Sequence, residues 1–269
     1  MPPLNGRKRA GDSTTSASGS SGKRSISLRY GIFSDVHSNQ EALDAVLSFF
    51  KKEGVEEYLC GGDTVGYGAE PRECIAKIRS LGTKGVGGNH DWACVGMFSA
   101  EEFNPLAKEA ILWTRDVLGE QELNFLKSLR NIDTFGDITV VHGSLDSPEE
   151  FRYIVDAESA SPTLNLLQTK VCFVGHSHLP MIISKDREGR VDLHRGGKAK
   201  MEKDHRYLVN VGSVGQPRDG DSRATCAIFD SDKSFVAIER VPYDIASAQK
   251  KMIRAGLPSF LAARLSEGW

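Results

Sequence analysis

The sequence predicts an α/β protein in which two β-sheets face each other and helices cover the outside. Three observations predict this fold. The first third of the chain alternates short apolar runs with segments of helical periodicity. The second half consists mostly of short strand-like runs, and the end of the chain returns to helical spacing. Strands that alternate with helices pair in parallel through right-handed crossovers, and the later strands supply a second sheet.

The first third supplies the alternating elements. Short apolar runs predict strands over Leu28–Ser34 and Glu56–Cys60, and a third strand ends at Gly85–Gly87. Apolar residues at helical spacing predict helices over Asn39–Lys52 and Pro71–Leu81, and the proline of the second fits the first turn. The order strand, helix, strand, helix, strand therefore predicts a parallel core for the first sheet.

The rest of the chain begins with a mostly helical stretch, Asn104–Leu129, and then changes its periodicity. Asp156–Gln168 is the one clear helix among the strands that follow, and Asp244–Arg254 and Pro258–Leu265 are expected to close the fold as helices. The predicted strands are Ile138–Val141, Val171–Val174, Pro180–Ser184, Val191–Arg195, Tyr207–Asn210, Thr225–Asp230 and Ser234–Arg240.

Residues 1–25 differ from the rest in composition. They are rich in Ser, Thr and Gly, contain almost no large apolar side chains, and carry a net charge of +4, which leaves −6 for the remainder. Such a segment cannot bury enough surface to offset the entropy of ordering, so we expect a disordered basic tail. One folded domain over residues 26–269 is expected to follow.

Composition also excludes several functional classes. The net charge of −2 argues against a partner such as long nucleic acid, which selects basic surfaces. No apolar stretch is long enough to span a membrane, and the N-terminus lacks the apolar core of a secretory signal. The five cysteines include no C-x-x-C pair, so we expect reduced thiols in a cytoplasmic protein, with Cys60 and Cys172 packed in the core. The sequence does not predict an oligomeric state.

Five short polar segments follow predicted strands, and they carry the chemistry. They are Asp35-Val-His37, Gly61-Gly62-Asp63, Gly88-Asn89-His90-Asp91, Val141-His142-Gly143 and Gly175-His176-Ser-His178. Ligands of α/β sheets bind beyond the carboxyl ends of strands, so these segments are expected to converge. In Asp35-x-His37 and His176-x-His178 an extended backbone would place both side chains on one side.

The mixture of oxygen and nitrogen donors, without thiolates, suits divalent ions such as Mn, Fe, Zn, Co or Ni, whereas Ca or Mg alone prefers oxygen. Each segment alone has a simpler interpretation, because Asp63 could be a turn or capping residue and Asn89 a left-handed turn residue. Five strand-end segments in order, with two Asp, one Asn and five His, are hard to explain as turn chemistry.

The five segments resemble the signature blocks of the calcineurin-like metallophosphoesterase superfamily, which read D-x-H, G-D, G-N-H-[DE], H and G-H-x-H. Gly66–Cys74 and Asn210–Arg218 are similar to its small single-domain bacterial and archaeal branch. The resemblance covers about Leu28 to Phe229 and implies a four-layer sandwich. It implies a dinuclear-metal-dependent phosphoesterase, with two divalent ions (Mn, Fe, Zn, Ni or Mg) held by the chain.

The resemblance also implies a role for each residue. Asp35, His37 and His178 would hold one metal ion, Asn89, His142 and His176 would hold the second, and Asp63 would bridge both. His90 would bind no metal but would act on the phosphate and its leaving oxygen. A hydroxide bridging two ions about 3.5–4 Å apart would then attack phosphorus in line. Asp91 has no implied role.

The second block departs from the Ser/Thr phosphatases of this superfamily, which have G-D-x-V-D-R-G. Gly66 stands where they have the Asp that pairs with the catalytic His, and Tyr67 stands where they have a phosphate-clamping Arg. This argues against a dedicated protein phosphatase. Arg218 is a candidate replacement clamp, since a guanidinium matches phosphate oxygens bidentately, although it could equally be a surface residue.

The favoured function is hydrolysis of phosphomonoesters or small phosphodiesters. A nucleotide-specific phosphodiesterase or pyrophosphatase and a non-catalytic scaffold on the same fold are the alternatives. The complete set of blocks, including His90, favours catalysis over a scaffold. The sequence does not predict the physiological substrate, whose selection we expect from residues 92–130 and 144–165.

Overall fold

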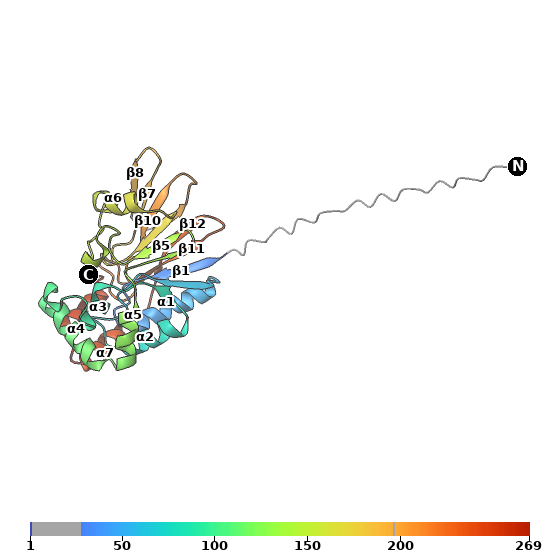
Figure 1. The fold of residues 1–269 in the computed structure, drawn as a ribbon. Coiled ribbons are helices and arrows are strands. Elements are labelled where there is room, and N and C mark those ends of the chain that lie inside the picture. Colours follow the sequence, from blue (N-terminus) through green and yellow to red (C-terminus); the bar gives the residue numbers. More distant parts are fainter. Residues whose placement is uncertain (2–27, 196) are drawn as a thin grey trace.

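The computed structural model describes Met1, residues 28–195 and residues 197–269. The predicted tail, residues 1–25, lies outside this description apart from Met1. Two six-stranded sheets pack face to face with helices outside them, which confirms the predicted fold class (Figure 1). No helix in the described ranges is long and apolar enough to cross a membrane. All five cysteines are buried and free of disulfides.

The first sheet has the order β3-β2-β1-β11-β12-β9. Its first three strands are parallel to one another, and the others pair antiparallel. The carboxyl ends of the parallel strands therefore lie at one edge of the sheet. The strands are β1 (Arg29–Phe33), β2 (Glu57–Cys60), β3 (Lys84–Gly85), β9 (Lys198–Lys200), β11 (Ala224–Asp230) and β12 (Phe235–Val241).

The second sheet has the order β4-β5-β6-β10-β7-β8. Its central strands β5, β6 and β10 are parallel, β4 and β7 pair antiparallel with β5 and β10, and β8 pairs antiparallel with β7. In the first sheet, by contrast, the parallel strands run inward from the β3 edge. The strands are β4 (Ile132–Phe135), β5 (Ile138–Val141), β6 (Val171–Val174), β7 (Met181–Lys185), β8 (Val191–His194) and β10 (Arg206–Asn210).

Alternation along the strands divides the core into layers. In β1, Ile32 packs between the two sheets, whereas Phe33 packs against α1 on the outer face. Between the sheets, Phe173 of β6 meets Phe229 of β11 with ring centroids 5.9 Å apart. The outer face of the second sheet is covered by α6, whose Leu164 joins a separate cluster. These contacts hold the two sheets face to face.

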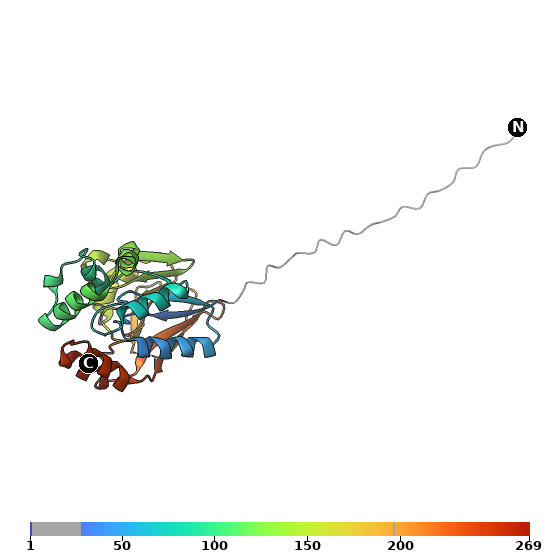
Figure 2. The ribbon, with the colours of Figure 1, turned by 90° about the horizontal axis from the view of Figure 1, so that it is seen from below.

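Most helices lie around the first sheet, and α6 lies on the far side of the second (Figure 1). Seen from below, the C-terminal helices in red lie beside α1 in blue (Figure 2). The α-helices are α1 (Gln40–Lys52), α2 (Pro71–Ser80), α3 (Asn89–Cys94), α4 (Pro105–Val117), α5 (Glu120–Ser128), α6 (Ala157–Leu166), α7 (Ile245–Arg254) and α8 (Ser259–Ala263). Three short 3₁₀ turns are η1 (Ala100–Glu102), η2 (Pro148–Glu150) and η3 (Arg264–Ser266).

Several predicted elements differ from those observed. The helical stretch Asn104–Leu129 is two helices, because Leu118 is extended and Gly119 is the N-cap of α5. The strand predicted at Gly85–Gly87 is β3, which ends at Gly85. The sequence did not predict α3, β4 or β9. These elements are six residues long or shorter, and β4 and β9 are largely exposed, so neither shows an apolar run.

Candidate metal centre

The five predicted segments meet where the parallel strands of both sheets end. Asp35 and His37 follow β1, and Asp63 follows β2. Asn89 and His90 begin α3, while the remaining three histidines come from the second sheet, namely His142 after β5 and His176 and His178 after β6. All of these side chains are buried, with at most 8% of any of them exposed. The site therefore lies on the seam between the sheets.

Close approach of the two sheets at this seam requires glycine. A Cβ on Gly175 would lie 2.2 Å from the Asp35 Oδ2 atom and 2.1 Å from the Ser34 Oγ atom. The backbone N–H of His176, the next residue, instead donates to Asp35 Oδ2 at 3.0 Å. The first and last segments are thus in direct contact although they are separated by about half of the chain.

Backbone carbonyls orient three of the histidine rings. The Nδ1 atom of His37 lies 3.1 Å from the Val65 carbonyl oxygen, and that of His142 lies 2.7 Å from the Gly61 oxygen. The Nδ1 atom of His178 likewise lies 2.5 Å from the Gln216 oxygen. A carbonyl only accepts, so each Nδ1 carries the proton in these contacts. The Nε2 lone pair of a neutral ring is then free to bind a metal ion.

These Nε2 atoms converge with the two carboxylates. The Nε2 atoms of His37 and His178 lie only 3.2 Å apart, and His178 Nε2 lies 3.1 Å from Asp35 Oδ1. On the other side, His142 Nε2 lies 3.2 Å from both Asp63 Oδ2 and Asn89 Oδ1. Lone pairs and carboxylates that face one another in a buried site need a cation between them. The residues present therefore fit divalent metal ions.

Overlapping groups of donor atoms lie within 4.8 Å of one another. One contains Asp35, His37 and His178, and another contains Asp63, His142 and His176. These groups coincide with the two predicted ligand sets, to which Asn89 adds its amide oxygen. A third group joins His37, Asp63 and His90, so proximity alone does not separate His90 from the ligands. The division into ligands and a non-ligand His90 stays a prediction.

Burial and charge set the protonation of the site. Burial lowers the pKa of His37 and His178 well below that of free imidazole and lowers the pKa of His176 to about 3. These rings are therefore neutral near pH 7, as metal ligands must be. For His142, burial also favours the neutral ring, but the charges of Asp63 and Asp35 outweigh it and raise the pKa to about 9.

The backbone at the ligands is left-handed, which contradicts the extended conformation expected from the sequence. Asp35 and His37 have φ values of 54° and 49°, and His176 and His178 have 63° and 58°. Asp63 has a φ of 50°. Non-glycine residues rarely adopt this region, and such strain gathers at functional sites. Tight bends, rather than an extended strand, therefore turn both side chains of each pair into the site.

Asp91 has a clear structural position. Its carboxylate accepts the backbone N–H of Val65 at 3.1 Å and that of Gly88 at 3.1 Å. It is fully buried, and burial together with the nearby Asp63 charge raises its pKa to about 7. Asp91 thus joins the segment that follows Asp63 to the segment that carries Asn89 and His90.

His90 lies beside the candidate ligands in a pocket of rings. Its ring centroid lies 4.5 Å from that of Tyr67, 4.7 Å from Phe103 and 4.8 Å from His37. Its Nδ1 atom is buried without a hydrogen-bond partner and faces Gly66, where a Cβ would lie 2.5 Å away. Burial lowers the pKa of His90 to about 4. The backbone N–H of His90 donates to Asp63 Oδ1 at 2.8 Å, and ring packing positions its imidazole.

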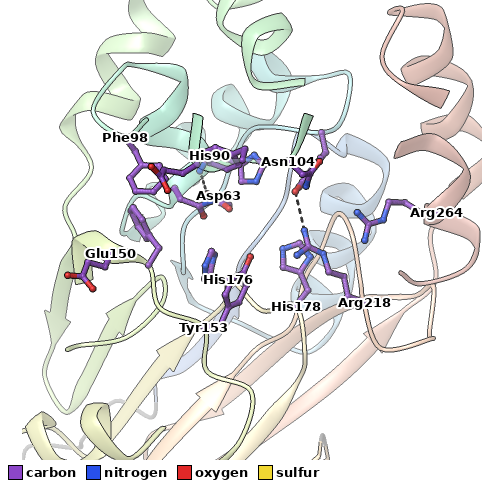
Figure 3. Close-up of a pocket in the computed structure, with 15 residues that line it drawn as sticks. Asp63, His90, Phe98, Asn104, Glu150, Tyr153, His176, His178, Arg218 and Arg264 are labelled. Atoms are coloured by element: carbon purple, nitrogen blue, oxygen red, sulfur yellow. Dashed lines mark hydrogen bonds between the residues drawn. The ribbon is translucent and has the colours of Figure 1, made fainter. Parts of the chain in front are cut away.

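A cavity of about 430 Å³ opens above these residues (Figure 3). Arg218 lines it and donates from Nη2 to the Tyr67 hydroxyl at 3.3 Å and to Gln216 Oε1 at 3.1 Å. Arg218, the predicted phosphate-binding arginine, thus contacts Tyr67. Tyr67 occupies the position at which the Ser/Thr phosphatases of the superfamily have their own phosphate-binding arginine. Asp35, His37 and His142 are buried and do not line the cavity.

The sequence missed other residues of the cavity wall. Tyr153 stacks on His176 with ring centroids 4.0 Å apart, and Phe103 packs against His90. Arg264, from η3, faces the cavity from the other side (Figure 3). No motif marks these residues, because each comes from a segment outside the five blocks. Phe103 and Tyr153 do fall within the ranges 92–130 and 144–165 that were expected to shape the pocket.

Known proteins share the sequence pattern and the fold of this chain. Residues 28–234 match the family model of the calcineurin-like phosphoesterase superfamily domain. The chain belongs to this superfamily. A metallophosphoesterase from Sphaerobacter thermophilus is 44% identical, with a TM-score of 0.80, and the match covers 90% of this chain and 100% of that one. The family confirms the resemblance found in the five sequence blocks and implies hydrolysis of phosphoesters.

Two further members of the comparison extend this likeness to archaea. An uncharacterized protein of Methanocaldococcus jannaschii is 41% identical over 241 residues, which cover 88% of this chain and 97% of that protein. A hypothetical protein of Pyrococcus horikoshii OT3 is 21% identical, with a TM-score of 0.73, over 90% of this chain and 99% of its own. The second shows the calcineurin-like phosphoesterase fold alone.

Proposed function

We propose that this calcineurin-like phosphoesterase hydrolyses phosphomonoesters or small phosphodiesters with two divalent metal ions. One observation carries the proposal. The Nε2 atoms of His37 and His178 face each other at 3.2 Å beside the buried carboxylate of Asp35. Neutral imidazoles in this arrangement have no proton to share, so a metal ion accounts for it best. The partner is a small substrate in the cytoplasm, and the acidic body argues against long nucleic acid.

The ligands divide as the family pattern implies. Asp35, His37 and His178 would hold one ion, and Asn89, His142 and His176 would hold the other, with Asp63 between them. When bound, the ions would supply a nucleophilic water near neutral pH and offset charge on the phosphoryl oxygens.

The chain's own residues act on the ester. His90 is neutral near pH 7, since its pKa is lowered to about 4 by burial. With Nδ1 against Gly66, Nε2 is the atom that can reach a phosphate, where its proton would stabilise the leaving oxygen. Arg218 would bind a non-bridging oxygen and offset charge in the transition state.

The test begins with metal-stripped protein. We expect p-nitrophenyl phosphate or bis(p-nitrophenyl) phosphate to be hydrolysed after addition of Mn²⁺, Ni²⁺ or Mg²⁺ and not before. Release of nitrophenolate measures turnover, and total metal analysis measures occupancy. Full occupancy without turnover of either ester would reject the enzyme and favour the scaffold.

His90→Ala separates catalysis from metal binding. We expect the variant to keep its metal and to lose about 10²–10⁴-fold in kcat, the usual contribution of a positioned proton donor. The measurement pairs turnover of the nitrophenyl esters with metal content. Loss of metal from His90→Ala would show that His90 is a ligand and that the assigned role is wrong.

A further inference from the structure

Two arginines line one side of the cavity. Arg218 lies on the loop after β10, and Arg264 begins η3 in the C-terminal segment (Figure 3). Both line the cavity that also contains Asp63, His90 and His176. At about 430 Å³ this cavity lies within the range of small-molecule sites and is larger than one phosphate group requires.

Neither arginine has an acidic side chain as its partner. Among the described residues no ion pair within 4.0 Å involves Arg218 or Arg264, and Arg218 Nε is buried without any hydrogen-bond partner. The acids on the neighbouring loop are already paired, since Asp219 accepts from Arg240 and Asp221 accepts from Arg223.

The acids of the cavity itself lie elsewhere. Glu150 stands on the opposite side (Figure 3) and accepts from Arg152 at 2.8 Å. Glu102 is exposed and forms no ion pair with either arginine. Two arginines therefore line the cavity without an acidic side chain paired to either of them.

Contacts hold the two arginines close together. Arg218 is fixed by the Tyr67 hydroxyl, and Arg264 donates from Nε to the Trp269 carbonyl and lies over the Phe260 ring at 6.0 Å. The two segments are joined where the Gly220 N–H donates to the Gly268 carbonyl at 2.9 Å. Partial burial, and then the charge of Arg218, lowers the pKa of Arg264. Such a pair is costly unless an anion offsets it.

We propose that Arg264 binds a second anionic group, beside the scissile phosphate that Arg218 would contact, so that the preferred substrate is a phosphate ester that carries another phosphate. This inference rests on the proposed phosphoesterase function. The scissile phosphate would lie between the candidate metal centre and Arg218, and the second phosphate would reach Arg264. A planar guanidinium pairs with phosphate through two parallel hydrogen bonds, which favours phosphate over a single-point acceptor.

The test compares substrates that differ only in the second phosphate. The phosphate monoesters of ethylene glycol, butane-1,4-diol and hexane-1,6-diol are paired with the bisphosphates of the same diols. The series of lengths is needed because the linker has to match the span of the cavity. Release of inorganic phosphate by the metal-loaded enzyme gives kcat and KM for each compound. We expect one bisphosphate to exceed its monophosphate in kcat/KM by about tenfold or more, the value of one charge-assisted hydrogen bond.

Arg264→Gln is the decisive variant. We expect it to reduce the ratio of kcat/KM between the bisphosphate and its monophosphate to about one, chiefly through KM. Arg264→Lys should recover part of the preference, because lysine keeps the charge but cannot form two parallel hydrogen bonds. Arg254→Gln, an exposed arginine at the end of α7, is the matched control and should keep the wild-type preference. A thermal melt of each variant shows that it is folded.

Binding of non-hydrolysable analogues separates the two proposals. Calorimetry measures the Kd of butane-1,4-bisphosphonate and of butylphosphonate for the metal-loaded wild type and Arg264→Gln. If neither ester is hydrolysed but Arg264 still selects the bisphosphonate, the proposed function fails and the anion subsite stands. If the monoester is hydrolysed but Arg264→Gln leaves both the preference and the bisphosphonate Kd unchanged, the subsite is rejected.

Discussion

Gly66 stands directly against the unpartnered Nδ1 atom of His90. A Cβ at this position would lie 2.5 Å from Nδ1, and the residue has a φ of 96°, which side chains rarely tolerate. The absence of a side chain therefore leaves room for the ring of His90, which is packed by Tyr67 and Phe103 instead.

Gly66→Ala should consequently displace His90. We expect kcat to fall by at least about tenfold with metal content unchanged, because a small misplacement of a catalytic group is enough to slow a reaction strongly. Turnover and metal analysis of the same sample check this. Gly136→Ala is a suitable control, since Gly136 also has a positive φ but its added Cβ would meet nothing within 4 Å. Wild-type kcat in Gly66→Ala would contradict the proposed position of His90.

The protonation of His142 predicts a link between metal binding and pH. Asp63 and Asp35 outweigh the effect of burial and raise the pKa of His142 to about 9 in the metal-free site, so the ring is charged at pH 7. A metal ligand must be neutral, so binding must release this proton. We expect metal affinity to rise as pH increases toward about 9. Calorimetry at pH 7 in two buffers with different ionisation heats checks the release, and identical heats in both would contradict it.

At the scale of elements, the start of α1 connects the loop that carries Asp35 and His37 to the loop that carries Arg218. Its N-cap Asn39 accepts the Ala42 N–H through Oδ1 at 3.1 Å and donates through Nδ2 to the Gly215 carbonyl at 3.0 Å. Asn104 caps α4 in the same way, accepting from Ala107 at 3.1 Å, without a buried link of this kind. The two caps therefore form a matched pair.

Asn104→Ala should lower the free energy of unfolding by about 1 kcal/mol, the usual value of an N-cap. Asn39→Ala should lower it by about 1–3 kcal/mol more, because the buried Gly215 carbonyl also loses its donor. Urea denaturation of metal-free protein measures both changes. Equal losses in the two variants would mean that the link to Gly215 contributes nothing to stability.

The elements that the sequence could predict were those with a buried face. Phe33 and Phe50 belong to long apolar patterns, and β1 and α1 were found close to their predicted bounds. The Lys-Ala-Lys strand β9 pairs at an exposed sheet edge and shows no such pattern. The site followed the same logic. Short motifs predicted the residues that gather at the metal centre, whereas Arg264 reaches the cavity only through the packing of a distant helix, which no local pattern encodes.

At the scale of the whole molecule, the site draws its donors from both sheets. Asp35 and Asp63 follow strands of the first sheet, and His142 and His178 follow strands of the second. A metal ion that binds only the folded arrangement stabilises it by mass action, by about 2.7 kcal/mol at a free concentration of 100 Kd.

Removal of metal should therefore lower the melting temperature, and addition of Mn²⁺ should restore it in a concentration-dependent way. Asp63→Asn should abolish this dependence, since Asp63 is proposed to bridge both ions, whereas Asp192→Asn on the exposed face of β8 should preserve it. Differential scanning calorimetry with and without chelator measures the effect. A melting temperature insensitive to metal in the wild type would argue against a site that spans both sheets.

The packing of Phe173 against Phe229 between the sheets has a consequence for how this protein can evolve. Some candidate ligands follow strands of the first sheet and the others follow strands of the second. The spacing between the sheets therefore sets the distance between these two groups of side chains. A change of side-chain volume in this layer alters that distance without touching a ligand. If metal ions bind here as proposed, core residues between the sheets would also influence which ion size fits, and a comparison of site residues alone would miss this.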